Sequence, residues 1–195
     1  PPECDVPLRP GWFYHSSEDD CVRPLPLLTD IYFKSVGRGG MLNLGIAPDR
    51  RGLVHENDVK RLSEFSRAVG RIFANNVGES DGGEITLGSR MFNVIELRED
   101  ISMGEQITSF VIEAKINGAW KTIHQAKSVG TKRLIRLDGK VKADAVRARI
   151  LGSLVSARIE KMALYDAPSE LLETSCASLR SFDPGVYSEL KACTA

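Results

Sequence analysis

The 195-residue sequence has no net charge and no long apolar run. Lys plus Arg and Asp plus Glu each number 26, so no long-range field attracts the chain to phosphates, and nucleic acid is not an expected partner. No stretch approaches the roughly 20 apolar residues of a membrane-spanning helix, so no membrane partner is expected. The chain opens on Pro1 and Pro2, without an initiator Met or a signal-peptide apolar core. A globular chain is predicted, and its opening is typical of a fragment or a processed piece.

Patterns for bound metals and phosphates are missing too. No CxxC pair occurs, which argues against a zinc site. No dense acidic loop indicates a calcium site, and the sequence leaves open whether the β-strand region binds calcium. The run Gly37–Gly40 precedes a strand-like stretch and no Lys-Ser or Lys-Thr pair follows it, so a phosphate-binding loop is not indicated. No cofactor and no metal are therefore expected.

The cysteines lie in two pairs near the ends of the chain. Cys4 and Cys21 are close to one end, and Cys176 and Cys193 are close to the other. Three pairings are possible, and two local bridges are one of them. A disulfide within either pair would close a short loop and contribute on the order of 3 kcal/mol to stability in the chain-entropy model. Such bridges suit a secreted, apoplastic or lysosomal (luminal) protein. Four reduced, buried thiols are the alternative, and the pattern does not decide between them.

Residues 25–75 have the pattern of an α/β layer. Helical spacing of apolar residues over 25–36 predicts a helix, and the run 41–46 predicts a buried parallel strand. A second helix is expected from Asn57, with a buried stripe that consists of Val59, Leu62, Phe65, Val69 and Ile72. Since parallel strands need neighbours on both sides, residues 1–75 are expected to be part of a larger fold.

The composition changes after Phe73. Residues 76–83 are rich in glycine and polar residues and predict a linker. From residue 84 the apolar residues alternate with polar ones, and Asn117-Gly118 predicts a tight hairpin turn. Strands are expected at 110–116, 120–123, 132–137, 146–150 and 159–165. Residues 84–166 therefore predict an antiparallel β-sandwich, and residues 167–195 a tail with one short helical stretch at 169–173.

The first 20 residues gather side chains that suit sugar chemistry. Glu3 and Asp5 are two apart, Arg9 follows, and Trp, Phe, Tyr and His occupy 12–15. Within this stretch, Pro7, Pro10 and Gly11 prevent one long helix. A loop that carries a site is therefore predicted over residues 1–20.

Three blocks of the sequence resemble the α-L-fucosidases of glycoside hydrolase family 29. They are ECDVPLRPGWFYH at 3–15, YFKSVGRGG at 32–40 and APDRRGL at 47–53, in the family's order. The resemblance covers residues 1–166 and implies an α+β fragment. In it, the C-terminal part of a (β/α)8 barrel, residues 1–75, would precede a jelly-roll, galactose-binding-like β-sandwich. A complete barrel takes about 250 residues, so the N-terminal barrel portion of the same enzyme is the implied missing partner.

The resemblance implies part of a retaining α-L-fucosidase that removes terminal α-L-fucose, α1,3- or α1,4-linked, from glycans or glycoconjugates. In a retaining glycosidase one carboxylate attacks the anomeric carbon and another protonates the leaving oxygen. By the match to the family's block, Glu3 is implied as the catalytic acid/base, and Arg9, Trp12 and His15 as substrate-binding residues. The family's nucleophile is an aspartate on an earlier barrel strand, which nothing before Pro1 supplies. The 195-residue chain by itself is therefore expected to be inactive.

Structural alternatives stand beside these assignments. Glu3 could be an ordinary surface acid, Asp5 is expected to be a structural hydrogen-bond acceptor, and Phe13 is expected in the core. His15 could bind sugar or cap a turn, and His55 and His124 are expected to be surface or satisfied histidines.

A second function, of a different class, is a non-catalytic carbohydrate-binding protein built on the β-sandwich. Arg147 and Arg149 share a strand face and could contact glycans, although alternating solvent-facing charge is the common explanation. An inactive truncated product is a third possibility.

Overall fold

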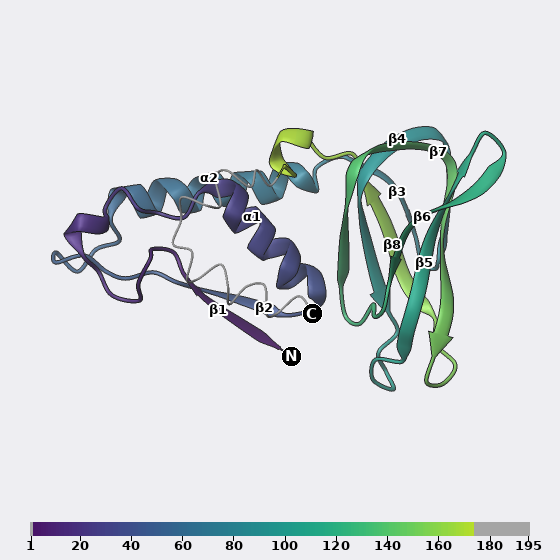
Figure 1. The fold of residues 1–195 in the computed structure, drawn as a ribbon, viewed down its shortest axis with the longest axis horizontal. Coiled ribbons are helices and arrows are strands. Elements are labelled where there is room, and N and C mark those ends of the chain that lie inside the picture. The colour runs from purple at the N-terminus through teal and green to yellow at the C-terminus, as the bar shows by residue number, and fades with distance from the viewer. Residues whose placement is uncertain (1, 174–195) are drawn as a thin grey trace.

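The computed structural model describes residues 2–173 of the chain. Figure 1 shows two parts beside each other: α1, α2, β1 and β2 in one, and an antiparallel sheet in the other. No helix among the described residues is both long and apolar enough to cross a membrane.

The first part contains a two-stranded parallel sheet. β1 (Glu3–Pro7) pairs with β2 (Met41–Gly45) from Glu3 opposite Met41 to Pro7 opposite Gly45. The predicted parallel strand is confirmed, but two expectations are wrong. Residues 3–7 form a strand where a loop was expected, because their partner lies far along the chain. β2 is not fully buried, since Met41 is 57% exposed and β1 is its one partner strand among the described residues.

Two α-helices follow the strands. α1 (Leu25–Lys34) begins after Pro24, with Pro26 in its first turn as predicted. It packs Leu27 and Ile31 against Val6 of β1. The short 3-10 helices η1 (Ser16–Glu18) and η2 (Val36–Arg38) flank α1 in the sequence.

α2 (Glu56–Ile72) starts one residue before the predicted position. The His55 side chain caps it by accepting a hydrogen bond from the Asn57 backbone N–H. The expected buried stripe is only partly correct: Ile72 is fully buried, but Val59 is 49% exposed. The reason is that the N-terminal end of α2 buries a carboxylate, Asp58, and only its C-terminal end packs into an apolar cluster.

The second part is a six-stranded antiparallel sheet with the order β3-β8-β4-β7-β5-β6. Its strands are β3 (Asn76–Ser80), β4 (Glu84–Glu99), β5 (Ile107–Ile116), β6 (Ala119–Ala126), β7 (Arg133–Ser153) and β8 (Ile159–Tyr165). Apolar side chains from β3, β4, β5, β7 and β8 meet in one core. The hairpin turn is confirmed, with Asn117 and Gly118 at φ 53° and 80°.

The structure corrects two of the predicted element boundaries in this sheet. Residues 76–80 of the predicted linker are β3, which pairs with β8 along its length despite its glycine. The strands expected at 132–137 and 146–150 are one strand, β7, because Asp138 and Gly139 continue the chain through a register shift against β4 where a turn was read.

The start of the predicted tail is packed against the sheet. Asn93 exchanges two hydrogen bonds with the backbone of Ala167, at 2.8 and 2.9 Å. The short helix η3 (Ser169–Leu171) follows, inside the stretch predicted to be helical. Cys4 and Cys21 are not bonded to each other within residues 2–173. Because Cys176 and Cys193 lie outside the described residues, the other pairings stay predictions.

An apolar cluster joins the two parts. Phe33 of α1 and Ile72 of α2 pack with Val94 and Leu134 of the sheet. Rings extend the cluster, since Phe73 meets Tyr165 edge to face at 5.1 Å between centroids. The end of the helical part is therefore fixed against the sheet by burial of apolar surface.

Candidate active-site residues

Glu3 and Asp5 lie on the same side of β1, and both are exposed. The Asn43 side-chain amide on β2 donates a hydrogen bond to Glu3 Oε1 at 3.4 Å. Asp5 makes no side-chain hydrogen bond to any described residue, so the expectation that it is a structural acceptor is wrong. The two carboxylates are free of ion pairs within residues 2–173, and Glu3 is available to a ligand.

A hollow of 490 Å³ runs along β1. Its lining includes Pro2, Glu3, Asp5, Trp12 and Arg38. The hollow is large enough for a monosaccharide, and it brings two of the predicted site residues, Glu3 and Trp12, to one surface.

Arg9 is buried, with 2% of its surface exposed. Its Nε donates to both carboxylate oxygens of Asp58, at 3.1 and 3.0 Å, and its Nη1 donates to Asp19 at 3.0 Å. Burial alone would lower the pKa of Arg9, but the hydrogen bonds to Asp58 and Asp19 outweigh it and raise that pKa. Arg9 therefore connects the segment after β1 to α2, while its expected contact with sugar oxygens stays a prediction.

Trp12 and Phe13 lie on the surface of the loop that follows β1. Trp12 is 56% exposed and its ring covers Gly45, where a Cβ would come within 2.9 Å of the indole. Phe13 is 79% exposed, so its expected place in the core is wrong. Tyr14 takes the inward position instead, donating to Asp19 at 3.3 Å and lying 5.2 Å from the Arg9 guanidinium carbon. Exposed aromatic rings of this kind can stack on a sugar face.

The histidines of this region differ in role. His15 is exposed and precedes η1, but its side chain makes no capping bond. Its sugar contact stays a prediction. His55 caps α2 through Nδ1, and its Nε2 lies 3.5 Å from Asp19 Oδ2, which confirms a satisfied histidine.

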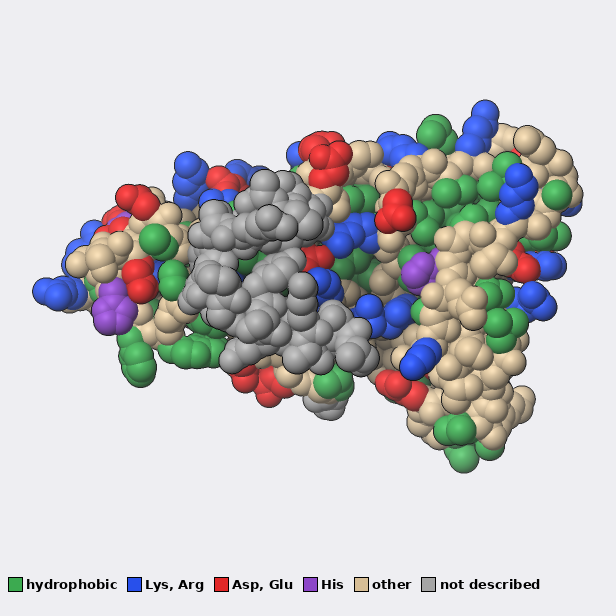
Figure 2. All heavy atoms as spheres, viewed as in Figure 1, with side chains coloured by type: hydrophobic (Ala, Val, Ile, Leu, Met, Phe, Trp, Pro, Cys, Tyr) green, Lys and Arg blue, Asp and Glu red, His purple; other side chains and the backbone are tan. Residues whose placement is uncertain are grey.

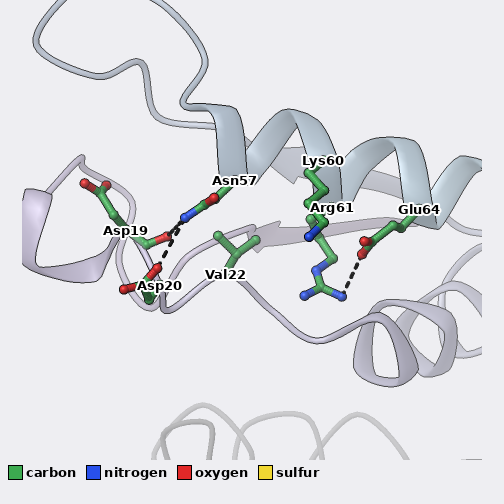
Figure 3. Close-up of a pocket in the computed structure, with 7 residues that line it drawn as sticks. All are labelled: Asp19, Asp20, Val22, Asn57, Lys60, Arg61 and Glu64. Carbon is green, nitrogen blue, oxygen red and sulfur yellow. Dashed lines mark hydrogen bonds and ion pairs between the residues drawn. The ribbon is translucent and has the colours of Figure 1, made fainter.

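Figure 3 shows a second hollow, of 190 Å³, between the η1–α1 connection and α2. Asn57 spans it by donating to the backbone oxygen of Asp19 at 2.7 Å and to Asp20 Oδ1 at 3.4 Å. Arg61 faces Glu64 across 3.1 Å. Charges of both signs line this hollow, so it presents no single charge to a ligand, and the hydrogen bonds of Asn57 fasten the loop to α2.

The sequence pattern did not reveal Asp19 and Asp58. An acid near the start of a helix is usually an exposed capping residue, and Asp58 instead turns inward to Arg9. Only the pairing of two segments 49 residues apart could reveal this role.

The sheet carries a separate polar group. Arg147 Nε donates to Glu113 at 2.7 Å, and Arg149 donates to the same carboxylate at 3.2 Å. Arg147 also covers the Trp120 ring at 4.1 Å. Both arginines are engaged in cross-strand ion pairs, which favours the solvent-facing charge explanation over a glycan contact.

Comparison with known proteins identifies the class. No family model matches the chain. Alpha-L-fucosidase 1 of Arabidopsis thaliana is 32% identical over 206 residues, which cover 85% of this chain and 40% of that protein. Two solved structures described as candidate α-L-fucosidases each match 85% of this chain. The Bacteroides thetaiotaomicron protein has 32% identity, a TM-score of 0.79 and 41% of its length covered. The Bacteroides ovatus protein has 39% identity and a TM-score of 0.78, and the match covers 30% of its length.

The chain is thus related to a class of glycoside hydrolases, and it spans less than half the length of the curated relatives that it matches. More narrowly, it corresponds to the C-terminal part of the α-L-fucosidases of family 29, as the three sequence blocks indicated.

Proposed function

We propose that this chain is the C-terminal portion of a retaining α-L-fucosidase. The enzyme hydrolyses terminal α-L-fucose, α1,3- or α1,4-linked, from glycans or glycoconjugates. Residues 1–75 form the end of a (β/α)8 barrel, and a jelly-roll sandwich starts at residue 76. The observation that carries the proposal is the match over 85% of the chain to a protein named as an α-L-fucosidase. A secreted, apoplastic or lysosomal location belongs to the same proposal.

The arrangement of the first part supports a barrel end. β1 and β2 are parallel neighbours connected through α1, and α2 follows β2, which is the repeating unit of a (β/α)8 barrel. Catalytic sites of such barrels stand at the C-terminal ends of the strands. Figure 1 shows that the loops after β1 and β2 lie at the same end of this part. Trp12 and His15 belong to the first of these loops, where they would contact the sugar.

Glu3 is proposed as the acid/base on the resemblance. Its exposure and its place beside the 490 Å³ hollow support access to a ligand. Its position as the first residue of β1 does not, because a barrel site would be expected at the other end of that strand. The family's aspartate nucleophile would come from an earlier strand, so residues 1–195 alone would be inactive.

The test is made in the longer protein that contains this chain. If Glu3 protonates the leaving oxygen, Glu3→Gln lowers kcat on a fucoside with a poor leaving group by about 100-fold or more and affects an activated aryl fucoside less. Trp12→Ala raises KM for both substrates. Unchanged kcat in Glu3→Gln would remove Glu3 from the mechanism. Turnover of fucosides by residues 1–195 alone would contradict the proposal that the nucleophile comes from an earlier strand.

A further inference from the structure

A third hollow lies between the helices and the sheet, next to the 490 Å³ hollow, with which it shares Lys34 and Arg38. Its volume is 170 Å³, and its polar lining consists of Asp30, Lys34, Arg38, His124, Arg133 and Arg136. Figure 2 shows Lys and Arg side chains gathered near the middle of this face, between the helical part and the sheet. Four cations and one carboxylate therefore surround a space of a few water molecules.

The backbone holds the two sides of this hollow together. A Cβ on Gly37 would come within 3.0 Å of Leu134 Cβ, and one on Gly39 would come within 2.6 Å of Thr131 Oγ1. Gly39 also has a φ of +78°, which an L side chain rarely adopts. Because these two glycines have no side chains, η2 packs closely against the start of β7. This contact brings Arg38 close to Arg133.

The positive charges of the hollow are only partly compensated. Lys34 and Arg136 both pair with Asp30, at 2.7 and 2.9 Å. Arg38 and Arg133 have no carboxylate partner within residues 2–173. Among the residues that line this hollow, two polar atoms are buried without a hydrogen-bond partner from residues 2–173: Nε of Arg133 and Nε2 of His124. Buried polar groups are seldom left unpaired in a folded protein, so each of these atoms needs an explanation.

The surroundings of this hollow disfavour its positive charges. Burial, and then the charge of Arg38, lowers the pKa of Arg133 to about 10. Burial also lowers the pKa of His124, and Arg133 and Arg38 add to that effect against the opposing charge of Asp138. The half-buried guanidinium of Arg133 and the exposed one of Arg38 beside it favour the approach of a negative charge.

We propose that this hollow binds a compact oxyanion, a phosphate or sulfate group, between Arg38 of η2, Arg133 of β7 and His124 of β6. The planar guanidinium groups match the oxygens of such an anion, and the buried Nε of Arg133 would gain an acceptor. The bound group would connect the helical part to the sheet. The proposal does not rest on the hydrolysis of fucosides, although Arg38 also lines the 490 Å³ hollow beside Glu3.

The experiment measures the unfolding temperature of the whole chain while sodium sulfate or phosphate is titrated at constant ionic strength against sodium chloride. Sulfate and phosphate are expected to raise the unfolding temperature saturably, and calorimetry should show one site. Arg38→Gln and Arg133→Gln should each weaken binding about tenfold or more, because a charge-assisted hydrogen bond is lost. Arg71→Gln, which removes an exposed ion pair with Glu170, is the matched control and should leave the response unchanged.

Two sources could supply the anion, and the same assay separates them. If galactose 6-sulfate binds more tightly than inorganic sulfate, a sulfated glycan is the ligand; equal affinities indicate the free ion. Should Arg133→Gln fail to fold, Arg38→Gln still decides, since Arg38 is exposed. Equal stabilisation by chloride and sulfate, or a response that survives Arg38→Gln, overturns the proposal.

Discussion

Arg9 binds Asp58 with one nitrogen: its Nε lies 3.1 and 3.0 Å from the two carboxylate oxygens, although 49 residues separate them in the sequence. Both side chains are almost completely buried, at 2% and 1% exposed. A pair of this kind fixes the loop after β1 to the start of α2, and so positions the loop that carries Trp12.

The first prediction concerns this pair. Asp58→Asn keeps the shape but leaves the Arg9 charge without its buried partner, and we expect a loss of about 3 kcal/mol in the free energy of unfolding. Urea denaturation of the whole chain measures it. Glu64→Gln, on the same helix and in a partly exposed ion pair with Arg61, is the control and should cost less than about 1 kcal/mol. Equal losses in the two variants would contradict the role given to Arg9.

The second prediction is an acid-sensitive loop. Hydrogen bonds from the Arg51 side chain lower the pKa of Asp49 from 3.8 to about 2. Because the folded pKa is lower than the unfolded one, the stabilisation is complete above about pH 4 and is lost as the pH falls toward 2. We expect Asp49→Asn to flatten the dependence of stability on pH between 4 and 2. A slope that is the same in the variant and in the parent chain would refute this assignment.

The third prediction compares two glycines. Gly39→Ala forces a side chain onto a φ of +78° and against Thr131, so it should destabilise the chain by about 1–3 kcal/mol. Gly70→Ala places a methyl group in open space on α2, where alanine is the better helix former, and should stabilise it by roughly 0.5–1 kcal/mol. Thermal unfolding of both variants checks the opposite signs. A stabilising Gly39→Ala would show that η2 does not approach β7 as closely as described.

The fourth prediction concerns the segment after β8. Asn93 is 2% exposed and satisfies both backbone groups of Ala167. Asn93→Ala leaves a buried N–H and a buried C=O unpaired, and the expected cost is about 2–3 kcal/mol. Hydrogen exchange should show faster loss of protection at Ala167 and Leu172 than at Val111, which lies in β5. Unchanged exchange at Ala167 would show that Asn93 does not hold this segment.

Local patterns predicted much of the fold. The α1 helix, the β5–β6 hairpin and the β8 strand each depend on residues close in sequence, and the structure has them where periodicity and turn residues indicated. The expected strands did not include β1, β3 or β4, because each pairs with a distant partner: β2 for β1, β8 for β3, and β7 and β8 for β4. The sequence predicts a turn at Gly139, but β7 continues through it. No feature of the sequence distinguishes a long strand that contains a glycine from two strands joined by a turn.

The candidate site was predictable only as a set of residue types. Resemblance pointed to Glu3, Arg9, Trp12 and His15, and the structure brings Glu3 and Trp12 to one hollow. The burial of Arg9 could not be read from its neighbours, because it follows from Asp19 and Asp58 together.

The rings of Phe73 and Tyr165, which meet at the junction of the helical part and the sheet, set a practical limit on dissecting this protein. Dividing the chain between residues 75 and 76 would give two products that each expose apolar, aromatic surface to water. Both should aggregate unless that surface is redesigned. Expression trials of the isolated sheet would therefore do better to retain α2, or to replace Tyr165 and Leu134 with polar residues.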